Sequence, residues 1–255
     1  MSKWFIRPCK VDIGNMCRKM GINVPLALAL QAKGLNTPKK VKDYFNTENY
    51  SFGDITELIG VKRSFEIIEK AINENKKIFI YGDYDVDGVT STVILYKSLK
   101  ALGANVFYYI PNRVTDGYGL NVNAIERLIG KGMELLITCD NGIAAIEEIK
   151  YAKEKGIDVV IYDHHEPVIK DDKEILPEAD SVTDAKIENC GYDFTVMCAG
   201  GLCYRVMKSF YEYLGQKYTL EKEMIIFAGI ATVCDVVDLV GENRAIAKRS
   251  LELIN

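Results

Sequence analysis

Short apolar runs alternate with helical segments from residue 77 onward, and this alternation restricts the possible folds more than any other feature of the chain. Five runs read as strands, and they cover residues 78–81, 105–110, 134–139, 158–162 and 179–183. The helical segments between them end near residues 102, 130 and 155. Strands that alternate with helices of about 10–15 residues form a parallel sheet with helices on both faces. The sequence therefore predicts an α/β fold with a mostly parallel sheet of about five strands.

Helical periodicity also precedes and follows this part of the chain. Residues 25–33 and 40–45 have short helical patterns, and an amphipathic helix is expected over 56–73. Further helices are expected over 199–214 and 221–233, and from Arg244 onward. We predict three regions, which are an N-terminal helical segment over 1–58, an α/β domain over 59–240 and the start of a connecting helix over 241–255.

The composition indicates a soluble protein, with 48% hydrophobic and 27% charged residues. The densest apolar stretch, residues 24–30, is far shorter than the roughly 20 residues of a membrane span. The N-terminus lacks the apolar run and cleavage site of a secretory signal. The seven cysteines are odd in number and form no Cys-x-x-Cys pair, which favours reduced thiols in the cytoplasm.

The net charge of −4 argues, taken alone, against a surface that binds nucleic acid. Acidic residues that cluster around divalent cations would invert the local sign of the charge. The charge balance therefore leaves the partner open.

Polar side chains follow three of the predicted strands at the point where each strand ends. Asp83, Asp85 and Asp87 follow the first strand in Gly-Asp-Tyr-Asp-Val-Asp-Gly, and Asp140-Asn141-Gly142 follows the third. Asp163 and the only two histidines of the chain, His164 and His165, follow the fourth. Ligands of parallel sheets bind at the carboxyl ends of the strands, so these side chains are expected in one crevice.

The alternation of Asp83, Asp85 and Asp87 predicts three carboxylates on one side of an extended strand end. Carboxylates packed together repel one another unless cations neutralise them. Asp-x-Asp-x-Asp-Gly also opens a calcium-binding loop, but the twelfth position here is Ile94 and a strand precedes the motif, which argues against calcium. Each motif alone also has a structural explanation, such as an acidic turn that caps a helix.

The two adjacent histidine side chains diverge, so we expect one to ligate a metal and the other to face the substrate. Asp163 is then placed to hydrogen-bond the ligating imidazole. Asp235 or Asp238 supplies a further carboxylate, and the spacing does not choose between them. The pair Gly200-Gly201 precedes a helix, where it allows either a phosphate to approach or simple close packing.

Oxygen ligands mixed with imidazole suit Mn²⁺ or Mg²⁺. Two such ions activate a water molecule and stabilise the leaving oxygen in phosphoester hydrolysis. The residues by themselves therefore predict a two-metal phosphohydrolase.

Four segments, taken in order, resemble the motifs of the DHH phosphoesterase superfamily. They are Tyr81 to Thr92, Asp140 to Ile143, Asp163 to Pro167 and Ala231 to Leu239. Within the superfamily, the loop Pro111-Asn112-Arg113 with Asp116 to Leu120, the Ala199-Gly200-Gly201 turn and Asn243-Arg244 are similar to RecJ-type exonucleases, which digest single-stranded DNA in the 5′-to-3′ direction.

The resemblance implies a role for each matching residue. The metal ligands would be Asp85, Asp87, Asp140 as the bridging ligand, His164 and Asp235. Asp83 would be a further ligand or would lie close to the ions. His165 would contact the scissile phosphate with Asp163 beside it, and Arg113 and Arg244 would bind substrate phosphates unless they form structural salt bridges. The implied cofactors are two Mn²⁺ or Mg²⁺ ions, and the implied partners are the 5′ end of single-stranded DNA and repair or replication proteins.

Two departures from the family pattern affect these expectations. Asp238 stands where many members carry proline, which affects the loop. Family members also continue into a second domain, so Asn255 is expected to mark a fragment with weak activity, and the missing part would carry much of the basic surface.

Two alternatives stay open at this stage. One is a phosphoesterase for short oligonucleotides or cyclic dinucleotides. Pyrophosphate is disfavoured because Tyr81 stands where the pyrophosphatases carry histidine. The other is a non-catalytic scaffolding module, although such modules typically lose metal ligands that this chain retains.

Overall fold

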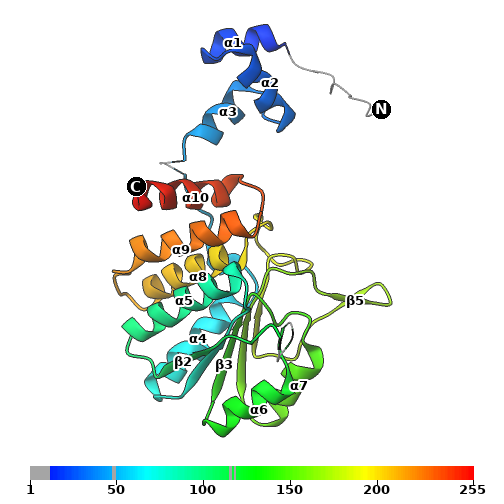
Figure 1. Ribbon diagram of the computed structural model, residues 1–255, viewed down its shortest axis with the longest axis vertical. Helices are drawn as coiled ribbons and strands as arrows, with labels where there is room; N and C mark the ends of the chain where they lie inside the picture. Colours follow the sequence, from blue (N-terminus) through cyan, green and yellow to red (C-terminus); the bar gives the residue numbers. More distant parts are fainter. Residues whose placement is uncertain (1–11, 48–49, 115–116, 118) are drawn as a thin grey trace. The chain divides into compact units, whose positions relative to one another are not determined.

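The computed structural model describes residues 12–47, 50–114, 117 and 119–255, and the chain divides into two compact units, 1–51 and 52–255. The described part of the first unit contains helices α1 (Ile13–Met20), α2 (Val24–Ala32) and α3 (Pro38–Phe45) (Figure 1). The side chains of Asp12, Asn23 and Thr37 cap their N-termini. This unit has a small core of its own, made by Met16, Ala27, Leu30 and Val41.

The second unit contains a five-stranded parallel sheet in the order β2-β1-β3-β4-β7. Its strands are β1 (Ile78–Tyr81), β2 (Val106–Tyr109), β3 (Leu135–Cys139), β4 (Asp158–Tyr162) and β7 (Ser181–Thr183). The predicted fold class is confirmed. Tyr81 pairs with Thr138, Cys139 with Tyr162, and Tyr162 with Thr183, so the carboxyl ends of four strands meet at one edge of the sheet.

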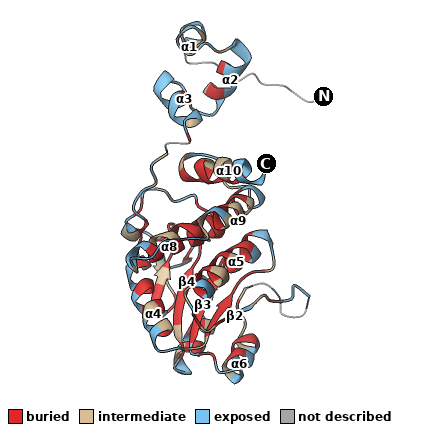
Figure 2. Cartoon of the chain, turned by 90° about the vertical axis from the view of Figure 1, so that its left-hand side faces the viewer, coloured by how far each residue is buried: buried red, intermediate tan, exposed pale blue. Residues whose placement is uncertain are grey.

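Helices cover both faces of the sheet, which is why its strands read as continuous apolar runs. One face, with Ile78, Ile80, Ile137 and Val160, packs into a core shared with α4, α5, α8, α9 and α10. These helices span Val61–Asn73, Val86–Ala101, Ala199–Tyr213, Glu221–Cys234 and Gly241–Ile254. The other face packs on α6 (Val122–Gly130) and α7 (Ile146–Glu154). Figure 2 shows the buried strands between the two layers.

The helix predicted over 56–73 is interrupted in the structure. A 3₁₀ turn, η1 (Ile55–Glu57), is followed by Gly60 at φ +85°, and α4 begins only at Val61. A Cβ at residue 60 would lie 2.2 Å from the carbonyl oxygen of Val182, so only glycine fits this approach. Ile55 and Leu58 are buried in the core of the second unit, which is why that unit begins before the boundary predicted at residue 58.

A hairpin lies between β4 and β7, after the two histidines. Strands β5 (Val168–Lys170) and β6 (Lys173–Ile175) pair antiparallel. Asp171 and Asp172 connect them with φ values of 51° and 58°. Positive φ at both central residues is typical of the turns that close two-residue hairpins.

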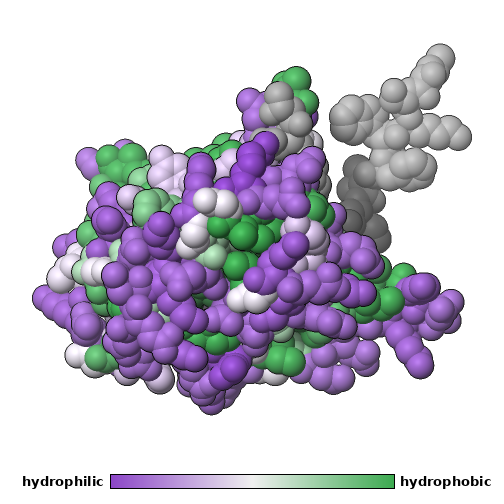
Figure 3. Space-filling view, turned by 90° about the horizontal axis from the view of Figure 1, so that it is seen from below, coloured by the Kyte–Doolittle hydropathy of each residue, from purple (hydrophilic) through white to green (hydrophobic). Residues whose placement is uncertain are grey.

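Among the described residues, no helix combines the length and the apolar character that crossing a membrane requires. The face of the molecule seen in Figure 3 carries mainly hydrophilic side chains, with small apolar areas between them.

Candidate metal centre

Acidic side chains and histidines converge at the carboxyl edge of the sheet. Asp83, Asp140 and Asp163 follow β1, β3 and β4 respectively. Three groups of residues each bring their candidate ligand atoms within 4.8 Å of one another, and these are Asp83-Asp85-Asp140, Asp87-His164-Asp235 and Asp140-His164-His165. All six residues predicted as metal ligands therefore lie in one cluster.

Asp140 and His164 connect the groups. Asp140 has a φ of 62°, and its N–H donates to the carbonyl of Tyr162 over 3.1 Å, which fixes it against the end of β4. The Nε2 atom of His164 lies 3.0 Å from Asp140 Oδ1 and 3.5 Å from Asp87 Oδ2. On the other side of the ring, Nδ1 lies 3.9 Å from Asp235 Oδ2. His164 therefore faces three carboxylates from three different elements.

The expectation that Asp83, Asp85 and Asp87 share one side of an extended strand end is wrong. Helix α5 already begins at Val86, with Asp85 as its N-cap accepting from the N–H of Gly88 over 2.9 Å. Asp87 lies in the first turn of α5 and joins His164, while Asp83 and Asp85 join Asp140. The three carboxylates thus serve two neighbouring groups because the chain turns into a helix between them.

The N-terminus of α8 holds Asp87 in place. The N–H groups of Ala199 and Gly200 donate to the two oxygens of Asp87 over 2.8 and 2.7 Å, an arrangement that helix N-termini favour for anions. The N–H of Gly201 donates to Cys198 Sγ. A Cβ at residue 200 would lie 2.5 Å from that of Ala231, so Gly200 allows the close packing. The approach of a phosphate to Gly200 and Gly201 stays a prediction.

Asp163 organises the loop that carries the histidines. One of its oxygens accepts from the N–H of His164 and shares a hydrogen bond with His165 Nδ1, each at 2.8 Å, and the other accepts from the N–H of Ile143 over 2.9 Å. The prediction paired Asp163 with the ligating imidazole, but the ring that it bonds is that of His165. Burial opposes ionisation of Asp163, yet these bonds and the charge of His165 hold its pKa below the usual value.

The electrostatics of the cluster fit divalent cations. Burial, with the nearby charges of Asp87 and Asp85, raises the pKa of Asp140 to about 10. Burial also raises the pKa of Asp87 to about 6, and it raises that of Asp83. The buried Oδ1 of Asp83 has no hydrogen-bond partner among the described residues. Crowded carboxylates of this kind, joined by one imidazole, form a donor set that suits Mn²⁺ or Mg²⁺.

The remaining predicted residues lie around this cluster. Arg113 is exposed, its guanidinium lies 5.4 Å from the ring centre of Tyr84, and its charge reaches Asp83. Arg244 is half-buried on α10. Asp235, and not Asp238, belongs to a candidate ligand group. Of the predicted loop motif beyond Arg113, Asp116 and Tyr118 lie outside the described residues.

Two polar residues at the same edge of the sheet received no role from the sequence. Asp184 directly follows β7 and is fully buried, with one oxygen that lacks a partner among the described residues. Asn141 is buried beside Asp140, and neither polar atom of its side chain has such a partner. The signal that selected Asp83, Asp140 and Asp163, a polar residue just after a strand, applies to both of them.

The fold and the cluster define an α/β protein with a candidate centre for divalent cations at the carboxyl edge of its sheet. The chain matches the model of the DHH family, N-terminal domain, over residues 77–232. It therefore belongs to the DHH family, as its motifs predicted.

Named relatives refine this assignment. The single-stranded-DNA-specific exonuclease RecJ of Bacillus subtilis (strain 168) is 37% identical over 251 residues, which are 98% of this chain and 30% of that protein. The protein of the same name from Haemophilus influenzae is 33% identical over 204 residues, 76% of this chain and 34% of that protein. The chain thus spans about a third of the length of these relatives.

Solved structures agree with this assignment. A crystal structure of exonuclease RecJ bound to manganese superposes with a TM-score of 0.68 at 31% identity, and covers 76% of this chain and 48% of that one. RecJ from Thermus thermophilus in complex with Mn²⁺ gives a TM-score of 0.73 at 25% identity, over 94% of this chain and 33% of that one.

Proposed function

We propose that the chain is the catalytic domain of a metal-dependent exonuclease that removes mononucleotides from the 5′ end of single-stranded DNA. The observation that carries this proposal is the convergence of Asp83, Asp85, Asp87, Asp140, His164 and Asp235 into adjoining groups whose ligand atoms lie within 4.8 Å of one another. The RecJ relatives that match most of the chain support the choice of substrate.

The residues of the cluster divide the work of such a reaction. Asp83, Asp85 and Asp140 would hold one cation, and Asp87, His164 and Asp235 the other, with Asp140 shared between them. When bound, the two ions supply the Lewis acidity that polarises a phosphoryl oxygen and lowers the pKa of a water molecule. The α8 amides fix the carboxylate of Asp87 before any ligand arrives, and the bond from the Asp140 N–H to the Tyr162 carbonyl fixes the backbone that carries the Asp140 carboxylate.

His165 is the residue that we assign to the scissile phosphate. Its Nδ1 is held by Asp163 at 2.8 Å, so the Nε2 side of the ring faces away from Asp163. The ring centres of His164 and His165 are 4.5 Å apart, which supports a phosphate contact beside the metal centre. Arg113, exposed and close enough for its charge to act on Asp83, is assigned to a further phosphate of the strand.

The wider setting of this activity is also a proposal. The described thiols of Cys17, Cys139, Cys190, Cys198, Cys203 and Cys234 are free, which supports a reducing compartment such as the cytoplasm. We assign the chain to DNA repair or recombination, with repair or replication proteins as partners.

The test is Mn²⁺-dependent digestion of 5′-phosphorylated single-stranded DNA. Bis(p-nitrophenyl) phosphate serves as a second substrate, whose hydrolysis does not require binding of a DNA strand. Asp235→Asn is expected to abolish both reactions. Asp238→Asn alters an exposed carboxylate of the same loop and is the matched control, expected to retain both. Hydrolysis that survives in Asp235→Asn would refute the assignment. Hydrolysis of the small ester alone would favour a phosphoesterase for small substrates.

A further inference from the structure

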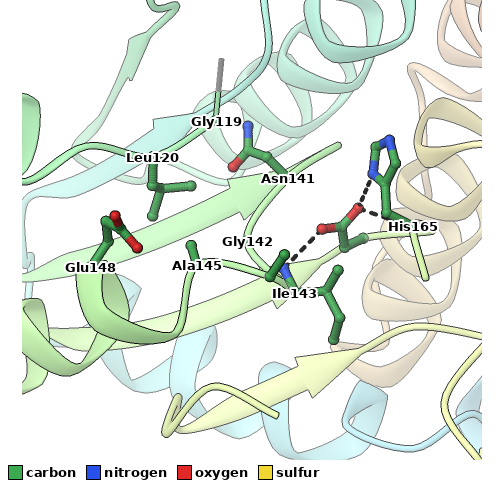
Figure 4. A pocket seen from close by; sticks show the side chains of 10 residues that line it. Gly119, Leu120, Asn141, Gly142, Ile143, Ala145, Glu148 and His165 are labelled. Carbon is green, nitrogen blue, oxygen red and sulfur yellow. Dashed lines mark hydrogen bonds and ion pairs between the residues drawn. The ribbon is translucent and has the colours of Figure 1, made fainter. Parts of the chain in front are cut away.

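A cavity of about 330 Å³ adjoins the metal centre on the side of α6 and α7. His165 lies at one end of it and Glu148, from the first turn of α7, lies at the other (Figure 4). Asp163, which is bonded to His165, also lines the cavity, and Leu120, Ala144 and Ala145 supply apolar wall. The volume falls at the lower end of the range for pockets that bind small molecules, about 300–1,000 Å³.

Asn141 gives this cavity an unused hydrogen-bonding group. The residue lines the cavity and is 4% exposed, yet neither Nδ2 nor Oδ1 has a partner among the described residues. The backbone carbonyl oxygen of Asn141 is occupied, since it accepts from the hydroxyl of Thr138 over 2.8 Å. Leaving a buried amide unpaired is unfavourable, so a native protein is expected to have a reason for it. A ligand with both donors and acceptors would satisfy both atoms.

The charges around the cavity decide which ligand fits. Glu148 contributes a carboxylate at one end of the cavity, and the lining residues that the structure describes include no lysine or arginine. A phosphate would be repelled at this end, whereas the carboxylate of Asp163 at the other end is already bonded to His165. A neutral, flat group that stacks on apolar walls and donates to a carboxylate fits better, and nucleobases with exocyclic amino groups have this chemistry.

We propose that this cavity binds the base of one of the two nucleotides that flank the scissile phosphate. In this arrangement Asn141 hydrogen-bonds the base edge, Glu148 accepts from its amino group, and Leu120 and Ala145 contact its faces. The position beside His165 places the base next to the phosphate contact assigned above. This inference rests on the proposed function, because it takes the scissile phosphate to lie at His165.

The test compares oligonucleotides that carry a normal base or an abasic sugar at the 5′-terminal or the second nucleotide. The readout is the ratio of kcat/KM for the normal strand to that for the abasic strand. Asn141→Ala and Glu148→Ala are the test variants, and the second is needed because Asn141 adjoins Asp140. Glu147→Ala is the matched control, since Glu147 is exposed on the same turn of α7 and does not line the cavity.

For the wild type and Glu147→Ala, removal of the base at one of the two positions is expected to lower kcat/KM about 10- to 100-fold, the range that one or two buried hydrogen bonds provide. In Asn141→Ala and Glu148→Ala the ratio should fall towards one. An unchanged ratio in both variants overturns the proposal, and so does a wild type that is indifferent to the base at both positions.

A second measurement separates this proposal from the proposed function. If the wild type cleaves none of the strands, the exonuclease assignment fails. Binding in the cavity is then tested by fluorescence titration with 2-aminopurine deoxynucleoside 5′-monophosphate. The proposal is supported if the wild type and Glu147→Ala bind this nucleotide and if binding weakens about tenfold, the value of one hydrogen bond, in Asn141→Ala and Glu148→Ala. Absence of binding, or equal binding by all four proteins, overturns it.

Discussion

On the side of the sheet covered by α5, α8 and α9, backbone amides bond both oxygens of Asp87, whereas on the side covered by α6 and α7 the amide of Asn141 has no partner among the described residues. Asp87 accepts two backbone hydrogen bonds from α8. Asn141, at the same edge of the sheet, has no side-chain partner among the described residues and lines a mainly apolar cavity. Groups that must be rigid for chemistry are fixed by internal bonds, while groups that recognise a ligand keep their bonding capacity for it.

The largest expected effect comes from removing the carboxylate of Asp140, which belongs to two of the three candidate ligand groups. Asp140→Ala should lower Mn²⁺-dependent hydrolysis at least about 1,000-fold, because a bound cation contributes several kcal/mol to stabilising the transition state. The measurement is kcat/KM on single-stranded DNA, with circular dichroism to check the fold. A loss smaller than tenfold in a folded variant would contradict the central role of Asp140.

The next effect concerns the positioning of His165. Asp163→Asn should lower kcat about 10- to 100-fold, the usual cost of removing a carboxylate that orients a functional imidazole, because Asp163 holds Nδ1 of His165. If Asp163 acts through His165, the double variant Asp163→Asn/His165→Asn should be no slower than His165→Asn alone. Independent, multiplying losses in the double variant would show that Asp163 acts by another route.

Asp184 tests whether every buried acid at the edge of the sheet belongs to the metal centre. Burial raises the pKa of Asp184 to about 8, so the folded protein keeps it protonated at a pH where the unfolded chain has lost that proton. Its contribution to stability is full below about pH 4 and declines as the pH rises towards 8.

Asp184→Asn should therefore increase the free energy of unfolding by a few kcal/mol near pH 8 and by much less near pH 4. The amide oxygen can still accept from the N–H of Lys186, as Asp184 does over 2.8 Å. Urea denaturation at the two pH values measures the difference. Destabilisation at pH 8 would mean that the ionised carboxylate has a partner and belongs to the site.

The smallest effect tests the packing that holds Asp87. Gly200→Ala should destabilise the protein by about 1–3 kcal/mol through overpacking, because the new Cβ would lie 2.5 Å from that of Ala231 and 3.2 Å from Asp87 Oδ1. Gly201→Ala is the matched control, since its Cβ would meet no atom closer than 3.5 Å. Equal unfolding free energies of the two variants would remove the packing explanation for Gly200.

The sequence predicted the sheet because short apolar runs mark the strands. Candidate ligands follow three of these runs, whereas Asp235 follows α9 and was selected over Asp238 only through the resemblance to the DHH superfamily. The position of Asp87 was less predictable, since α5 begins at Val86 and the acidic alternation resembles an extended segment. The interruption at Gly60 depends on the carbonyl of Val182, a contact over a long sequence distance that no local pattern reveals.

Pairings between side chains were the least predictable part of the site. Nothing in Asp163-His164-His165 states which ring the carboxylate contacts, because the answer depends on how the loop turns after β4. The hydrogen bond from Ile143 to Asp163 fixes that turn, and it comes from a segment 20 residues earlier in the chain. The unpaired amide of Asn141 is likewise a property of the assembled edge and not of the Asp-Asn-Gly motif.

The metal centre is tested most directly by a calorimetric titration of the metal-free chain with Mn²⁺, alongside Asp140→Ala. We expect two binding events in the wild type. In the variant we expect loss or strong weakening of both, because Asp140 adjoins both halves of the cluster. A wild type that binds no Mn²⁺, or a variant that binds it as the wild type does, would contradict the assignment of this edge of the sheet as a metal centre.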